Sequence, residues 1–208
     1  MPSFGAEKTA RRSTSPLDAA MRSASLIVLL AFSAATNSAV AGDASANFLA
    51  KLFATVCIPN VGQPDQVRAW AAARHLQEVT SPVALDLFVG PGGKGVAWAV
   101  PSAIGSFALS IRGTTEACAV WARVASPTDV ETLFRRILDG AARPGVDVSV
   151  VKDTRDQSPS GIVRTLIYSV SGIDKLRGGF VYTMQTAERS GGPFQASLQA
   201  ARFTTPQR

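Results

Sequence analysis

Apolar residues recur at helical spacing in three parts of the chain. In residues 46–57, five large apolar side chains at positions 48, 49, 52, 53 and 56 recur at spacings of three and four, which places them on one face of a helix. Residues 64–79 predict a second helix. A third helix is expected after Ser126, which can cap its start, with Asp129 placed to accept a hydrogen bond there or to meet the helix dipole.

Seven further segments carry strand signals, either period-two alternation or enrichment in β-branched and aromatic residues. They are residues 96–100, 107–111, 118–124, 146–150, 161–170, 179–188 and 194–204. Their short connections favour antiparallel pairing. The order predicts a single α+β domain: a curved antiparallel sheet of about six to seven strands, with two N-terminal helices and one central helix packed on one face.

The longest apolar run, residues 26–32, lies close to the N-terminus. Arg22 precedes it and Ala-Val-Ala at residues 39–41 follows, which is the order of a secretory signal peptide with its cleavage site. The run is far shorter than the ~20 residues that span a bilayer. We therefore expect a signal peptide over residues 1–41 and one domain over residues 42–208; an uncleaved N-terminal anchor is the alternative.

The start of translation is open between Met1 and Met21, because residues 1–20 are polar and carry no pattern of a folded element. The chain has a net charge of +6, but four basic and two acidic residues fall in the leader, so the rest carries +4. No basic stretch is longer than Arg135-Arg136. Nucleic acid is therefore not expected as a partner, since its binding usually needs a concentrated basic face.

Cys57 and Cys118 are the two cysteines of the chain, and sixty residues lie between them. In an exported protein, two cysteines most simply form one disulfide. This bond would tie the N-terminal helix to the sheet. A reactive or redox-cycling pair is the alternative, although such pairs usually have the C-x-x-C spacing, which this chain lacks.

Candidate catalytic and metal-binding residues are few. A Ser–His–carboxylate site would have to use His75, the single histidine, for which a solvated helix surface is the simpler interpretation. The glycine-rich residues 90–95 lack the Ser or Thr of a phosphate-binding loop and predict a turn. Asp153 and Asp156 lack calcium-loop spacing, so residues 152–157 predict a solvated hairpin turn. No catalytic residue, metal ligand or cofactor is assigned.

Three tryptophans, Trp70, Trp98 and Trp121, are expected mainly in the core or on the sheet. If two of them share an exposed face, they mark a binding groove, because large exposed apolar patches usually have a binding role. They are therefore kept as a candidate binding face.

The placement of helices, cysteines and strands resembles one known group. The similarity is carried by residues 53–57, by Trp98 ahead of residues 107–109, and by residues 116–120. These resemble the NMCC_0638 family of small exported bacterial (lipo)proteins, which has no assigned function. The resemblance implies export and paired cysteines, and it implies no catalytic residues. No cysteine stands at the expected cleavage site, so the lipoprotein form is not expected here.

The leading functional hypothesis is a non-enzymatic binding module in the periplasm or outside the cell. It would hold an unknown protein or small envelope ligand on the open face of its sheet, with no stable membrane span after signal cleavage. Two alternatives remain open: a hydrolase with a cryptic active site, and a component of an envelope or secretion assembly.

Overall fold

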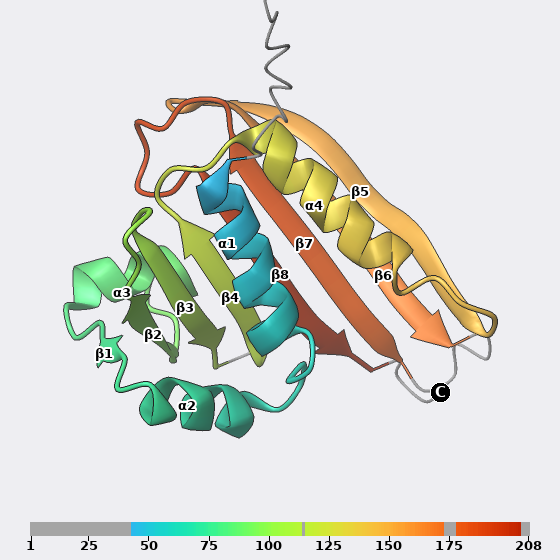
Figure 1. The fold of residues 1–208 in the computed structure, drawn as a ribbon, viewed down its shortest axis with the longest axis horizontal. Coiled ribbons are helices and arrows are strands. Elements are labelled where there is room, and N and C mark those ends of the chain that lie inside the picture. The colour runs from blue at the N-terminus through green and yellow to red at the C-terminus, as the bar shows by residue number, and fades with distance from the viewer. Residues whose placement is uncertain (1–42, 114, 173–177, 205–208) are drawn as a thin grey trace, which may run out of the picture. The chain divides into compact units, whose positions relative to one another are not determined.

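The computed structural model describes residues 43–113, 115–172 and 178–204, which belong to one compact unit. The predicted leader, residues 1–41, lies outside the described residues. Figure 1 shows an α+β fold. Its elements are α1 (Ala44–Leu52), the π-helix η1 (Phe53–Cys57), α2 (Pro64–Ala73), β1 (Gln77–Glu78), α3 (Pro82–Val89), β2 (Gly95–Val100), β3 (Phe107–Arg112), β4 (Ala117–Ala122), α4 (Pro127–Asp139), β5 (Val146–Ser158), β6 (Gly161–Gly172), β7 (Gly179–Ala187) and β8 (Ala196–Phe203).

The eight strands form one antiparallel sheet in the order β1-β2-β3-β4-β8-β7-β6-β5. The last strand of the chain, β8, lies between β4 and β7 and joins the two halves of the sheet. The predicted antiparallel α+β architecture is confirmed, but the sheet has eight strands and not the predicted six to seven. The additional strand is β1, whose two residues pair with Ala99 and Trp98 at the edge of the sheet. The second helix ends at Ala73, six residues before its predicted end.

The helices α1, α2 and α4 cover one face of the sheet, as predicted. Figure 1 shows α1 and α4 side by side across the middle strands, and both contact β8. The main core lies between these helices and the sheet. Its largest fully buried side chains include Phe53, Leu109, Phe134 and Leu198.

A fourth helix, α3, packs on the opposite face against β2 and β3, where no helix was expected. The sequence signals of its start are the same as those of α4. Ser81 caps α3 by accepting a hydrogen bond from the Ala84 amide, and Pro82 occupies the first helical position. Phe88 and Val89 from this helix form a second, smaller core with residues of β2, β3 and β4.

The starts of α1 and α4 are tied together by two aspartates. The Asp43 carboxylate caps α1 through the Ser45 amide at 2.8 Å and also accepts a hydrogen bond from the Ser126 amide. The Asp129 carboxylate accepts from the Asp43 amide at 3.1 Å. The predicted cap by Ser126 is present, and its hydroxyl accepts from the Asp129 amide at 3.4 Å. These hydrogen bonds therefore hold the N-terminal ends of α1 and α4 together.

The prediction of a solvated turn over residues 152–157 is wrong. These residues continue β5, which pairs with β6 along its whole length apart from a bulge between Val150 and Lys152. Asp153 instead forms an ion pair with Arg164 of β6 at 3.0 Å, and Arg164 also pairs with Glu131 of α4 at 2.5 Å. The charges fix α4 against the outer strands, and the hydrogen bond from Arg164 lowers the pKa of Asp153.

Candidate functional site

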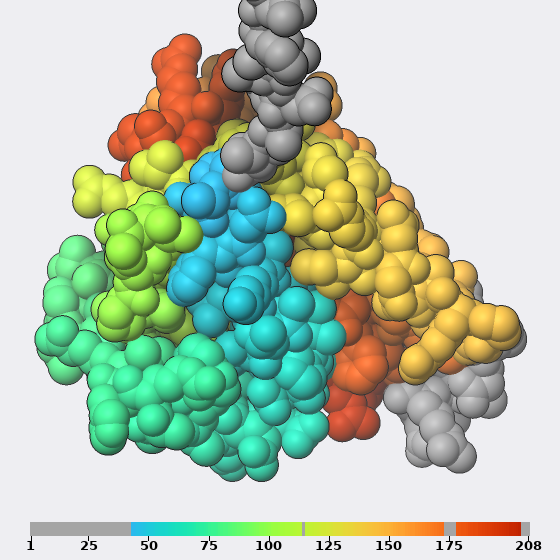
Figure 2. Space-filling model, viewed as in Figure 1, coloured from blue at the N-terminus to red at the C-terminus, as the bar shows by residue number. Residues whose placement is uncertain are grey.

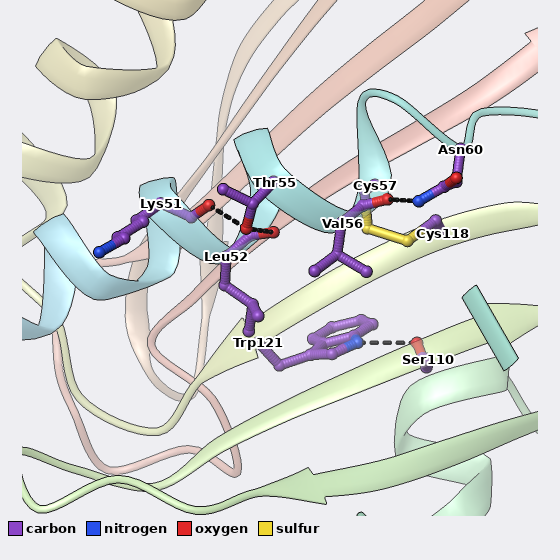
Figure 3. Close-up of a disulfide and its surroundings, with 9 residues drawn as sticks. All are labelled: Lys51, Leu52, Thr55, Val56, Cys57, Asn60, Ser110, Cys118 and Trp121. Atoms are coloured by element: carbon purple, nitrogen blue, oxygen red, sulfur yellow. Dashed lines mark hydrogen bonds between the residues drawn. A yellow bond between two sulfur atoms is a disulfide. The ribbon is translucent and has the colours of Figure 1, made fainter. Parts of the chain in front are cut away.

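A disulfide joins Cys57 to Cys118, as the sequence predicted (Figure 3). It connects the end of η1 to β4, with a Cα–Cα distance of 5.3 Å, and both cysteines are buried. Just before it, the Thr55 hydroxyl donates to the Lys51 carbonyl oxygen at 2.8 Å, four residues earlier. Just after it, the Asn60 side chain donates to the Val56 carbonyl oxygen, also at 2.8 Å. The disulfide thus fixes where the chain leaves the helix.

The chain that follows the disulfide forms one wall of a cleft. Gly62 has a φ of +72°, a conformation that L side chains rarely adopt, and so it allows the chain to turn here. A Cβ at this glycine would lie 3.1 Å from the Cδ atom of Arg202. The methylene stem of Arg202 therefore packs directly against Gly62, and its position depends on this glycine.

The cleft has a volume of about 690 Å³ and lies on the helix-bearing face, at the end of β5, β6, β7 and β8. Figure 2 shows the orange-red surface of the last strands exposed between the cyan segment near η1 and the gold α4–β5 turn. We call it the arginine cleft. It is lined by Val61, Gly62, Gln63, Ala141, Arg143, Val146, Val170, Ser171, Gly172, Gly178, Gly179, Phe180, Tyr182 and Arg202. Two other grooves are smaller than this cleft, one of about 380 Å³ beside Trp70 and one of about 350 Å³ beside Phe194.

Both charged residues among these lining residues are arginines. Arg143 comes from the α4–β5 turn and Arg202 from β8, and both are exposed. Within the described residues, neither guanidinium forms an ion pair with a carboxylate. A guanidinium has a planar set of donors that matches the oxygens of a carboxylate or phosphate. The cleft therefore offers two cationic donors that have no carboxylate partner in the described part of the chain.

Apolar side chains complete the lining. Val146, Val170 and Phe180 come from three adjacent strands, and Tyr182 lies beside Phe180 with ring centroids 6.5 Å apart. Burial raises the pKa of Tyr182, so its hydroxyl remains protonated at neutral pH and can donate a hydrogen bond. An apolar surface beside cationic and phenolic donors suits a ligand with an anionic group and an apolar part.

The three tryptophans of the candidate binding face do not share one surface. Trp98 is buried in the main core, whereas Trp121 is buried on the opposite face and donates to the Ser110 hydroxyl at 2.9 Å. Trp70 is half-buried on α2, and the guanidinium of Arg74 lies over its ring at 4.1 Å. Trp70 and Trp121 therefore line separate grooves on opposite faces of the sheet, and Trp98 packs in the main core.

Neither His75 nor the glycine-rich residues 90–95 line the arginine cleft. His75 is exposed, at the end of α2 with a φ of +51°, and among the described residues no hydrogen bond joins it to a serine or carboxylate. The turn prediction for residues 90–95 is confirmed in that Gly90 and Gly92 have positive φ between α3 and β2. Across the described ranges, no group of three His, Cys, Asp or Glu side chains is placed to hold a metal ion.

Sequence reasoning missed the arginine cleft because it is assembled from segments far apart in the chain. Gln63 and Arg202 are almost at opposite ends of the domain, and Arg143 lies in a turn with no pattern of its own. A glycine pair in the lining, Gly178-Gly179, was the available signal. A Cβ at Gly179 would lie 2.5 Å from the Val170 carbonyl oxygen, so this position needs glycine where two strands meet.

Comparison with family models, curated sequences and solved structures finds no match to this chain. The resemblance to the NMCC_0638 family stays a prediction. None of the helices in the described part of the chain has the length and apolar character needed to cross a membrane.

Proposed function

We propose that this protein is an exported, non-enzymatic binding module, and that its ligand occupies the arginine cleft. The observation that carries the proposal is that two guanidinium groups, Arg143 and Arg202, border one cavity with an apolar lining, and that neither forms an ion pair within the described residues. Here two charges of one sign border the same concave surface, which is a typical arrangement for anion recognition.

The ligand is a small amphipathic anion. Its acidic group would contact one or both guanidinium groups, and the Tyr182 hydroxyl would add a neutral hydrogen bond. Its apolar part would lie against Val146, Val170 and Phe180. A volume of about 690 Å³ is within the range that small-molecule sites usually have. The open sheet face, where the sequence placed binding, has the smaller grooves beside Phe194.

The disulfide supports location in the periplasm or outside the cell. Disulfides persist in oxidising compartments and are rare in the cytosol. Cys57 and Cys118 pair in a buried position that also sets the wall of the cleft. In this proposal export supports ligand binding, because an oxidising compartment preserves the disulfide and the disulfide holds the cleft wall in place.

Calorimetric titration of the full chain with decanoate tests the proposal. Decanoate should bind, whereas decyltrimethylammonium, with the same chain and the opposite charge, should not. Arg143→Gln and Arg202→Gln should each weaken decanoate binding by about tenfold or more, because a hydrogen bond to a charged group contributes about 1.5–3 kcal/mol. Arg74→Gln is the matched control, since Arg74 borders the groove of Trp70 and not this cleft.

Two outcomes would contradict the proposal. One is binding of the cationic and anionic amphiphiles with equal affinity, which would indicate an apolar surface without charge selection. The other is a loss on Arg74→Gln that equals the loss on Arg202→Gln, which would place the ligand outside the arginine cleft.

A further inference from the structure

The strand β5 is the outer strand at one end of the sheet, next to β6 only, as Figure 1 shows. It has 13 residues, whereas β1 at the other end has two. In residues 149–157 every side chain except Thr154 is exposed. Val150 and Val151 are among the large exposed apolar residues, at 55% and 62% of their full surface. A long edge strand of this kind presents unpaired backbone donors and acceptors to another strand.

Three charged side chains on this edge have no ion-pair partner in the described part of the chain. Arg155 faces Arg164 directly across the β5–β6 ladder, and a like-charge pair opposite one another is unfavourable. Lys152 faces Ile167 and Asp156 faces Val163, both apolar. Of the described residues, none forms an ion pair with Lys152, Arg155 or Asp156. Asp156 accepts one hydrogen bond, from the Thr154 hydroxyl at 3.1 Å.

We propose that β5 pairs with β5 of a second copy of this chain, antiparallel, with Thr154 facing its own copy. A two-fold axis between antiparallel strands requires that one residue be opposite itself. With Thr154 there, Lys152 lies opposite Asp156 of the second copy, and Asp153 lies opposite Arg155 of the second copy. By symmetry each pairing occurs twice. Arg155, which has a like charge beside it within the chain, gains a carboxylate neighbour.

The order of charges selects this register. Shifting the axis by one residue in either direction puts Asp153 opposite Asp153 or Arg155 opposite Arg155 of the second copy. Charged residues and bulges usually keep edge strands from pairing. At this edge the charges alternate so that one symmetric register is attractive and its neighbours are repulsive, and the bulge at Val151 limits the paired length. The edge of β5 therefore favours pairing with β5 of a second copy of the chain.

Sedimentation of the full chain over a wide range of protein concentrations tests the proposal, which is independent of ligand binding in the arginine cleft. A reversible monomer–dimer equilibrium is expected. Lys152→Glu and Asp156→Lys should each weaken the dimer by about tenfold, because each turns two attractive cross-strand pairs into repulsive ones. The exposed Lys94, between α3 and β2, supplies the control: Lys94→Glu makes the same change in charge and should leave the dimer intact.

Rescue distinguishes charge pairing from a structural effect. An equimolar mixture of the Lys152→Glu and Asp156→Lys proteins should form a heterodimer, because every cross-strand pair at these two positions again has opposite charges. The double variant should likewise recover the homodimer. The proposal is overturned if the wild-type chain stays monomeric at all concentrations, if the single variants dimerise as well as wild type, or if the mixture stays monomeric.

Discussion

The disulfide should make a large contribution to stability that can be removed by mutation. Replacing both Cys57 and Cys118 with alanine opens a loop with a sequence separation of 61 residues. In the chain-entropy treatment, closing a loop of this length stabilises the folded state by about 4 kcal/mol. Both side chains are buried, so removing the two sulfur atoms adds a smaller packing loss. For a domain of this size, we expect the midpoint of thermal unfolding to fall by about 10 °C.

Urea unfolding followed by circular dichroism measures this loss. The wild-type chain should lose about the same 4 kcal/mol when a reductant is added, whereas the double alanine variant should not respond to the reductant. A difference below about 1 kcal/mol between variant and wild type would refute the reasoning, since it would mean that the bond does not constrain the unfolded chain.

Reduction of the disulfide should also weaken ligand binding in the arginine cleft. The residues that follow Cys57 form the wall against which the stem of Arg202 packs at Gly62. We expect the reduced, still folded protein to bind decanoate more weakly than the oxidised protein. Equal affinity in the two redox states would show that the wall holds its position without the bond.

Three further substitutions test separate parts of the fold. Asp153→Asn should destabilise the protein above the ordinary aspartate pKa of 3.8, because Arg164 lowers the pKa of Asp153 in the folded state. In urea unfolding at a series of pH values, this difference from wild type should disappear as the pH falls below 3.8, and a pH-independent difference would contradict it. Trp121→Phe removes the donor to the buried Ser110 hydroxyl and should cost about 1–3 kcal/mol in chemical unfolding, with Ser110→Ala in the same chain recovering part of the loss. Ser126→Ala removes the cap of α4 and should cost about 1 kcal/mol by calorimetry; no change would assign the cap to Asp43 alone.

Sequence periodicity predicted the elements that bury one face against a core. The stripe of α4 follows directly from this burial. The strands β3 and β4 differ, because they are buried on both faces, between the main core and the smaller core under α3. The same logic explains what was missed. The second half of β5 is charged because it is exposed on an edge, so its sequence has the composition of a turn. The helix α3 is apolar on most sides and has no stripe, although Ser81-Pro82 carries the start signal.

The candidate site could not be predicted in the same way. The pairing of Cys57 with Cys118 followed from their number, and the structure confirms it. The neighbourhood of Arg143 and Arg202 depends on β8 entering the middle of the sheet, and local spacing does not encode that connection. Trp98 lies opposite Leu109 of β3, and Trp121 lies opposite Ala108 of β3. Neighbouring residues of a strand point to opposite faces, so the two tryptophans do as well.

An NMR titration of the ¹⁵N-labelled full chain with decanoate tests the central claim most directly. The arginine cleft predicts that the largest amide shift changes occur at its lining, including Gly62, Gly172 and Tyr182, and that they are lost in Arg202→Gln. Shift changes confined to the groove of Trp70 or to the cluster of Phe88, Trp121 and Phe194 on the opposite face would contradict it.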